Sequence, residues 1–124
     1  AGFSIGAHSV DHPFLQEMNE GDQLNQIRSS IDFVRDTFNV PYKAFAAPFN
    51  DKYLKKSFIK MLLEKGYIDI FFGTQGLKDD EIHRSYQRIE MDGSIANIKI
   101  KKAFTSMISK SFVLRLIGEN QVHR

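Results

Sequence analysis

Apolar residues recur along the chain at helical spacing in two stripes. Residues 21–38 carry the first stripe, in which apolar positions three and four residues apart share one helical face: Leu24, Ile27, Ile31, Val34 and Phe38. The second stripe repeats this spacing up to Gly66, a residue suited to end a helix: Leu54, Phe58, Met61 and Leu62. Pro41 closes the first segment, because proline has no amide hydrogen to continue the ladder. Both segments are predicted to be helices that bury one face.

Short apolar runs bounded by polar turns predict strands at residues 2–7, 42–47 and 67–72. The polar stretch from Gly73 to about Gln87 is predicted to be a loop, and residues 88–91 a short edge strand. Ser94 is suited to cap a last helix. That helix would present five apolar side chains: Ile95, Ile98, Phe104, Ile108 and Phe112.

Strands that alternate with helices predict a parallel sheet, because parallel neighbours need a crossover that helices supply. The chain is therefore α/β, either a small open domain or part of a larger barrel whose first strands precede Ala1. Polar clusters follow three predicted strands, at residues 8–12, 48–51 and 73–75. The C-terminal ends of parallel strands share one edge, where α/β folds gather their active sites.

Composition narrows the class of protein. With 124 residues, 42% hydrophobic and 26% charged, the chain fits one packed domain, and its interrupted apolar runs do not fit a membrane span. The absence of cysteine excludes disulfides and thiolate metal sites. The opening residues lack the features of a signal peptide, which leaves the bacterial cytoplasm and the cell envelope both open.

The positive charge is concentrated at the end of the chain. Residues 99–124 carry six Lys or Arg against one acidic residue, whereas residues 1–98 carry eleven against fourteen. A helix with a solvated basic face explains this pattern, and contact with a membrane surface or an anionic glycan is the alternative. The cations in question are Lys99, Lys101, Lys102, Lys110 and Arg115. The net charge is only +2, and the sequence contains no nucleic-acid recognition motif, so nucleic-acid binding is not predicted.

His8 and His12 lie four residues apart, directly after the first predicted strand. On a helical turn this spacing brings two imidazoles to one side, close enough to bind one metal ion. Zinc suits such nitrogen donors, and imidazole also accepts cobalt, nickel and iron. The alternative is that His8 is a hydrogen-bonded residue at a strand end and that His12 precedes Pro13 in an ordinary turn.

The segment from Gly2 to Pro13 resembles the second motif of the polysaccharide deacetylase family (NodB-homology domain), a strand followed by His-Ser/Thr-x-x-His-Pro. The third family motif, Arg-x-Pro-Tyr, is similar to residues 46–49, Ala-Ala-Pro-Phe. Residues 73–74, residues 87–89 and the closing helix also resemble the tail of family members. Residues 1–124 are thus interpreted as the C-terminal portion of one such domain.

The resemblance implies a distorted, TIM-like (β/α) barrel, a divalent metal (zinc first) held by Asp-His-His, and removal of N- or O-linked acetyl groups from a polysaccharide or lipid-linked glycan. His8 and His12 take the metal-ligand role in this resemblance. The backbone N–H of Phe49, after Pro48, would donate to the oxyanion of the reaction. Asn50 and Arg88 are assigned to substrate binding.

The sequence departs from the family pattern at three places. The Asp-Asp motif, which supplies the base and the third ligand, has no counterpart here and is expected upstream of Ala1; the role is not transferred to Asp79-Asp80. The motif arginine is replaced by Ala46, for which Arg88 is a candidate substitute. The late Leu-x-His has no clear match, since His83 and His123 are interpreted as surface residues.

Two functions therefore compete. The first is a metal-dependent deacetylase, of which this chain alone would be inactive. The second is a glycan-binding or scaffold protein that keeps the fold without the full acid/base set. An unclosed part of a barrel would expose strand edges and apolar faces, so the 124-residue chain is expected to be poorly soluble or to self-associate.

Overall fold

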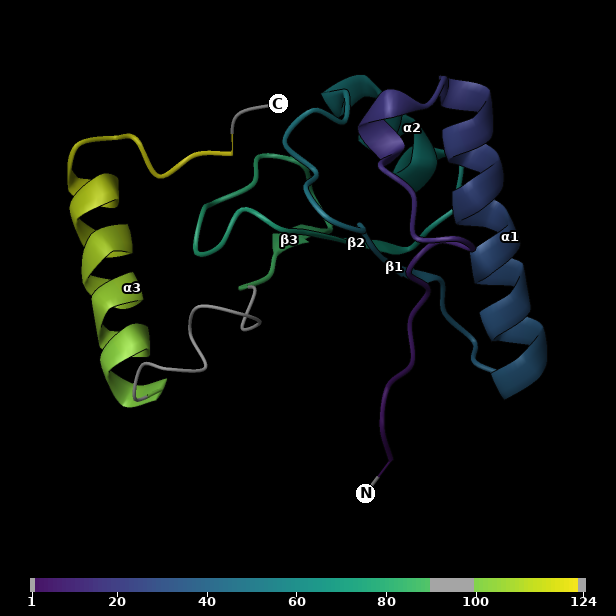
Figure 1. Ribbon diagram of the computed structural model, residues 1–124, viewed down its shortest axis with the longest axis horizontal. Coiled ribbons are helices and arrows are strands. Elements are labelled where there is room, and N and C mark those ends of the chain that lie inside the picture. The colour runs from purple at the N-terminus through teal and green to yellow at the C-terminus, as the bar shows by residue number, and fades with distance from the viewer. Residues whose placement is uncertain (1, 90–99, 123–124) are drawn as a thin grey trace.

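The computed structural model describes residues 2–89 and 100–122, with side chains of the second segment described from residue 105 onward. The described part is built from a single-turn helix, three helices and three short strands (Figure 1). In chain order these are η1 (Leu15–Glu17), α1 (Glu20–Phe38), β1 (Ala44–Ala46), α2 (Lys56–Glu64), β2 (Ile70–Gly73), β3 (Ser85–Gln87) and α3 (Ile100–Leu116).

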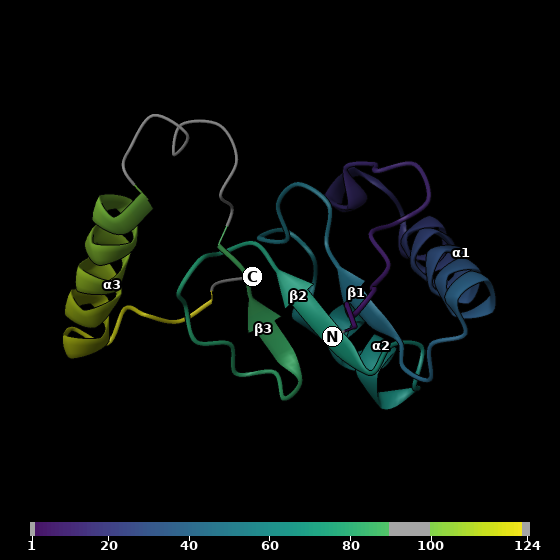
Figure 2. The ribbon, with the colours of Figure 1, turned by 90° about the horizontal axis from the view of Figure 1, so that it is seen from below.

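The three strands form one parallel sheet in the order β1-β2-β3, drawn as parallel arrows in Figure 2. Phe71 of β2 pairs with Phe45 of β1 on one side and with Ser85 of β3 on the other. Ala7 extends the sheet beyond β1 through a single parallel bridge to Phe45. The predicted α/β class and parallel sheet are confirmed, while the barrel remains a prediction, because the described strands form an open sheet.

The helix ends are fixed by local capping. Asn19 precedes α1, and its side-chain oxygen accepts the Asp22 N–H at 2.9 Å. At the end of α2, Gly66 adopts a positive φ of 66°, and the Tyr67 N–H donates to the Leu62 carbonyl at 2.9 Å. This is the hydrogen-bond pattern of a glycine-terminated helix, so the predicted end of the second helix at Gly66 is confirmed.

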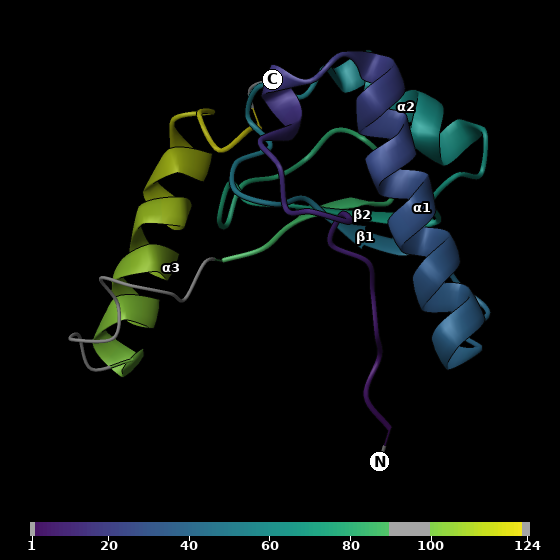
Figure 3. The same ribbon diagram turned by 45° about the vertical axis from the view of Figure 1, so that its right-hand side comes forward.

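The core lies on one face of the sheet. Phe45 and Phe71 are fully buried there, beneath α1, which packs on β1, and α2, which packs on β2 (Figures 1 and 3). The helices contribute the apolar faces that the sequence predicted, including Ile27, Ile31, Ile59 and Leu62. Among the described residues no helix covers the opposite sheet face, which presents Ala44, Ala46, Ile70 and Phe72.

The predicted strand at residues 2–7 is wrong except at its last residue. Only Ala7 pairs with β1, and the Phe3 side chain is 97% exposed. The segment runs away from the sheet below the strands (Figure 3), and the Ile5 N–H donates to the Tyr42 hydroxyl. An apolar run needs a neighbouring strand to become a strand, and the described chain offers one only at Ala7.

The edge strand predicted at residues 88–91 is not present at residues 88 and 89, and residues 90 and 91 lie outside the described part of the chain. Strand β3 lies instead at Ser85–Gln87, inside the predicted loop. The polar side chains of this strand are satisfied locally. Ser85 Oγ donates to Asp80 Oδ2 at 2.6 Å, and Gln87 Nε2 donates to the same oxygen at 2.9 Å. A polar segment can therefore pair with β2 without leaving buried groups unpartnered.

Helix α3 lies at the opposite end of the molecule from α1 (Figures 1 and 3). Arg115 forms an ion pair with Asp79 at 2.7 Å, and Ser111 Oγ donates to the Leu77 carbonyl. Two residues of the predicted apolar face, Ile108 and Phe112, are exposed rather than buried. Ser94, Ile95 and Ile98 fall outside the described residues, as does the side chain of Phe104. No helix in the described ranges is long and apolar enough to cross a membrane.

Candidate functional site

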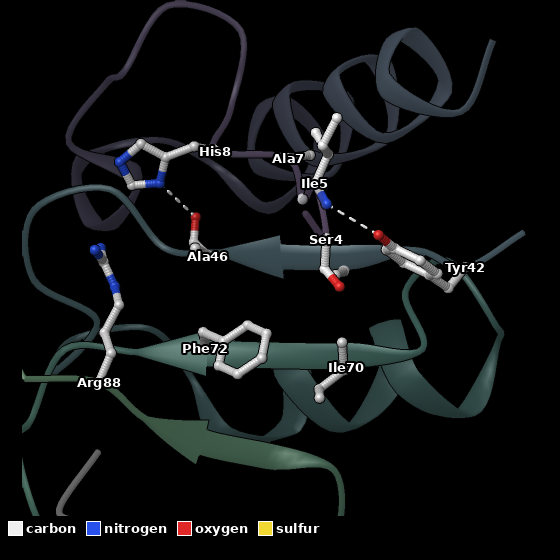
Figure 4. A pocket seen from close by; sticks show the side chains of 11 residues that line it. Ser4, Ile5, Ala7, His8, Tyr42, Ala46, Ile70, Phe72 and Arg88 are labelled. Carbon is white, nitrogen blue, oxygen red and sulfur yellow. Dashed lines mark hydrogen bonds between the residues drawn. The ribbon is translucent and has the colours of Figure 1, made fainter. Parts of the chain in front are cut away.

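The polar clusters predicted at strand ends meet at one edge of the sheet. Ala7, β1, β2 and β3 run parallel, so the residues that follow them emerge on the same side. His8 follows Ala7, residues 48–51 follow β1, and Thr74 follows β2. Arg88 follows β3 and turns back toward the end of β1 (Figure 4). The tertiary structure thus assembles the candidate site from four segments.

His8 and His12 face each other through their Nε2 atoms, which lie 3.0 Å apart. His8 Nδ1 lies 2.8 Å from the Ala46 carbonyl oxygen (Figure 4), which can only accept, so this nitrogen carries the proton. The neutral His8 ring therefore presents a lone pair at Nε2. Two nitrogens bound to one zinc ion at about 2.0–2.1 Å in tetrahedral geometry lie about 3.3 Å apart, close to the separation found here.

The electrostatic surroundings favour the neutral form of His8. Desolvation of its ring lowers the pKa of His8, and the positive charge of Arg88 and the His12 ring lower it further, against the opposing effect of the Ala46 carbonyl. A metal ligand must be unprotonated at the coordinating nitrogen. The lowered pKa therefore favours the form of His8 that binds a metal.

The loop between the two histidines is held by α1. Gln26 Oε1 accepts the N–H groups of Val10 and Asp11, at 3.0 and 3.3 Å, and its amide nitrogen donates to Asp11 Oδ2. Ser9 Oγ accepts the His12 N–H at 3.1 Å. Nothing in the sequence singled out Gln26, because its role depends on how the loop docks on the helix.

The β1–α2 loop places Phe49 beside the histidines. Its ring meets the His12 ring edge to face, with centroids 4.3 Å apart. Within the described residues the Phe49 N–H donates to no other atom, which leaves this donor available. Pro48, which precedes it, is buried. Asn50 Oδ1 accepts the Lys52 N–H at 2.8 Å, and no hydrogen bond joins Asn50 to the histidines in the described part of the chain.

A buried carboxylate ties this loop to the end of β2. Asp51 is fully buried, and its Oδ1 accepts both the Thr74 N–H at 3.0 Å and the Thr74 hydroxyl at 2.9 Å. Gly73 lies so close that a Cβ there would collide with the side chains of Asp51 and Gln87. The predicted polar clusters after β1 and β2 are therefore parts of one network.

Arg88 contributes the positive charge of the site. Its Nη2 donates to the Ala47 carbonyl, while its Nε is buried without a partner among the described residues. Together with His8 it lines a cavity of about 610 Å³ (Figure 4). The floor of this cavity is apolar and includes Ala46 and Phe72. Arg88 and His8 therefore line the same cavity, although they are distant in the sequence.

The other acidic and histidine residues weighed from the sequence lie elsewhere. Asp79 pairs with Arg115, and Asp80 accepts hydrogen bonds from the β3 side chains. His83 is exposed, and His123 falls outside the described residues. No group of three or more His, Cys, Asp or Glu side chains that could hold a metal occurs in residues 2–89 or 100–122.

Comparison with known families places most of the candidate site inside a matched region. The family model described as polysaccharide deacetylase matches residues 1–70, more than half of the chain. The matched range contains both histidines and the β1–α2 loop and stops before Arg88. No curated protein and no solved structure shows a significant match.

Proposed function

The chain belongs to the polysaccharide deacetylase family, and on that premise we propose that it supplies the histidine and oxyanion side of a metal-dependent deacetylase site. The proposed substrate is an acetylated polysaccharide or a lipid-linked glycan, and the reaction is hydrolysis of an N- or O-linked acetyl group. Membership supports deacetylation in general; the metal and the acetylated glycan are the parts that need testing.

One observation carries the proposal. The Nε2 atoms of His8 and His12 converge to 3.0 Å, and the other nitrogen of His8 is fixed by the Ala46 carbonyl. Metal-bound histidines are commonly oriented by a hydrogen bond of this kind at their second nitrogen. The two side chains fit a divalent metal such as Zn²⁺. The third ligand to this metal would come from a group outside the described residues.

A bound Zn²⁺ ion would supply Lewis acidity toward the acetyl carbonyl and lower the pKa of a water molecule. The chain itself would supply a donor and a positive charge. The free N–H of Phe49 would donate to the developing oxyanion, and rigid Pro48 limits the movement of that donor. Arg88 would bind an anionic or carbonyl oxygen, and Asn50 a sugar hydroxyl, at the rim of the same site.

A second candidate function is glycan binding without catalysis. Ala46 stands where the family motif has arginine, and a methyl group cannot make a charge-assisted bond to a carboxylate. Arg88 reaches the end of β1 next to Ala46, which favours the catalytic candidate. Binding of an acetylated glycan with no release of acetate would favour the second candidate.

The basic C-terminal helix is proposed only as an accessory contact to a membrane surface. Lys110 is exposed, whereas Arg115 is already paired with Asp79. Each exposed cation near an anionic lipid surface contributes about 1 kcal/mol. Sedimentation with anionic vesicles, compared between the protein and its Lys110→Gln variant, would detect this contribution.

The decisive experiment uses the full natural protein and its His8→Ala and His12→Ala variants. We expect each substitution to lower Zn²⁺ affinity by more than about 100-fold in calorimetric titration. Loss of a group that only hydrogen-bonds a metal ligand already lowers metal affinity by about 10–100-fold, and loss of the ligand itself should lower it more. Acetate release from an acetylated glycan should fall with it. His83→Ala is the matched control, since this exposed histidine lies outside the site. Unchanged affinity in both variants would refute the metal assignment.

A further inference from the structure

Two partly exposed phenylalanine rings continue the aromatic row that begins at the histidines. The rings of Phe14 and Phe49 are stacked, with centroids 4.1 Å apart and planes inclined by 11°. Phe49 in turn meets His12, whose ring lies 4.8 Å from that of His8. Phe14 remains 48% exposed and Phe49 42%. A continuous aromatic surface therefore runs from the proposed metal ligands outward to Phe14.

The backbone conformation of Phe49 is strained. Phe49 adopts a φ of 50°, in the left-handed region that a bulky side chain rarely occupies. Full burial does not compensate the strain, because Phe49 remains 42% exposed. Strained residues persist at sites where the surrounding structure fixes them for a function. The strain at Phe49 thus keeps an apolar ring at the surface next to His12.

The backbone next to each ring is restricted in conformation. Each follows a proline, Pro13 before Phe14 and Pro48 before Phe49, and proline fixes its own φ. A surface that is already ordered loses little conformational entropy when a ligand binds. Exposed apolar groups that cluster in this way mark binding sites more often than isolated ones do.

We propose that Phe14, backed by the stacked ring of Phe49, forms a stacking subsite for a pyranose ring, the sugar that adjoins the acetylated residue in a glycan chain, on the face of Phe14 turned away from Phe49. This inference rests on the proposed function, since it takes the substrate to be a glycan. The C–H groups on the face of a pyranose carry small positive charges, which complement the negative face of an aromatic ring. Because the aromatic row is continuous with His12, a glycan whose acetyl group lies at the histidines places its next ring against Phe14, at the outer end of the row.

The inference predicts a dependence on chain length. A monosaccharide that occupies the histidine end leaves Phe14 uncovered, whereas a longer chain reaches it. We therefore expect the β-1,4-linked tetrasaccharide of N-acetylglucosamine to bind more tightly than N-acetylglucosamine itself. Saturation-transfer NMR should show the strongest transfer from aromatic protons to ring protons of a sugar next to the one that carries the reacting acetyl group.

The test measures binding of that tetrasaccharide to the full natural protein, with Zn²⁺ present, by calorimetry and NMR. We expect Phe14→Ala to weaken binding roughly three- to tenfold, the range for one aromatic contact. Phe14→Trp should retain it, and Phe14→Leu should not, because leucine keeps the apolar area but lacks an aromatic face. Phe112→Ala is the matched control, an exposed phenylalanine on α3. Circular dichroism checks that each variant is folded.

The outcomes separate this inference from the proposed function. If Phe14→Ala binds the tetrasaccharide as the unchanged protein does, the stacking subsite is wrong, whatever the zinc titrations of His8→Ala and His12→Ala show. If the monosaccharide and the tetrasaccharide bind equally, it is also wrong. If Phe14→Ala instead abolishes dimerisation in analytical ultracentrifugation while glycan affinity is unchanged, the rings contact a second copy of the chain and the proposal is overturned.

Discussion

Replacing Asp51 by alanine would remove the carboxylate that joins the β1–α2 loop to the end of β2. This carboxylate is fully buried, and its Oδ1 accepts two hydrogen bonds from Thr74, one from the backbone and one from the hydroxyl. The same loop carries Phe49, whose ring contacts His12. The substitution therefore tests whether the candidate site is organised by a buried network or by the strands alone.

The expected loss follows from these contacts. A hydrogen bond to a charged group contributes about 1.5–3 kcal/mol, and the variant leaves the buried Thr74 N–H without its acceptor. Two such bonds amount to about 3–6 kcal/mol of unfolding free energy, a large share of the 5–15 kcal/mol typical of a domain. Asp51→Asn should lose less, because a carbonyl oxygen in the same place still accepts both bonds.

Urea unfolding of the full natural protein, followed by circular dichroism, provides the measurement. With a slope of about 1.5–2 kcal/mol per molar urea, we expect the Asp51→Ala midpoint to fall by roughly 2–3 M. Asp36→Ala is the control, an exposed carboxylate on α1 whose loss should change stability by less than about 0.5 kcal/mol. If Asp51→Ala costs no more than this control, the network does not stabilise the loop and the reasoning fails.

Two further predictions rest on neighbouring contacts. Gly73→Ala should lower the unfolding free energy by about 1–3 kcal/mol, because the added methyl group collides with Asp51 and Gln87. In an Asp51→Ala background the loss of unfolding free energy caused by Gly73→Ala should be smaller. A double-mutant cycle measured by urea unfolding that shows no coupling would contradict the close contact between Gly73 and Asp51. The second concerns Glu81, whose pKa is held below its ordinary value of 4.5 by a hydrogen bond from Lys56. The charged form is favoured in the folded state, so the contribution to stability is present above pH 4.5 and is lost as the pH falls. Lys56→Gln should raise the pKa of Glu81 in carboxyl NMR titration, and no change would show that the ion pair does not form in solution.

The sequence by itself predicted α1, the end of α2 and the parallel sheet. Apolar spacing located α1, because one face of it had to be buried, and Gly66 marked the end of α2 because few other residues tolerate its positive φ. The alternation of strands and helices was sufficient to predict a parallel sheet, since parallel neighbours require crossovers. The four-residue spacing predicted that the His8 and His12 rings would meet on a helical turn. Their Nε2 atoms do lie 3.0 Å apart, but residues 8–12 are not helical, and Gln26 of α1 holds the loop between them.

Only the tertiary structure decided which apolar runs became strands and which side chains completed the site. Residues 2–6 have an apolar pattern but no neighbour to pair with, whereas polar β3 is a strand because β2 lies beside it and Asp80 satisfies its side chains. Arg88, Gln26 and Phe14 reach the candidate site from separate segments of the chain. Local spacing carries information about neighbours within a helix turn or along a strand. Strand pairing and contacts between distant segments depend on the whole chain, so no local pattern could have predicted them.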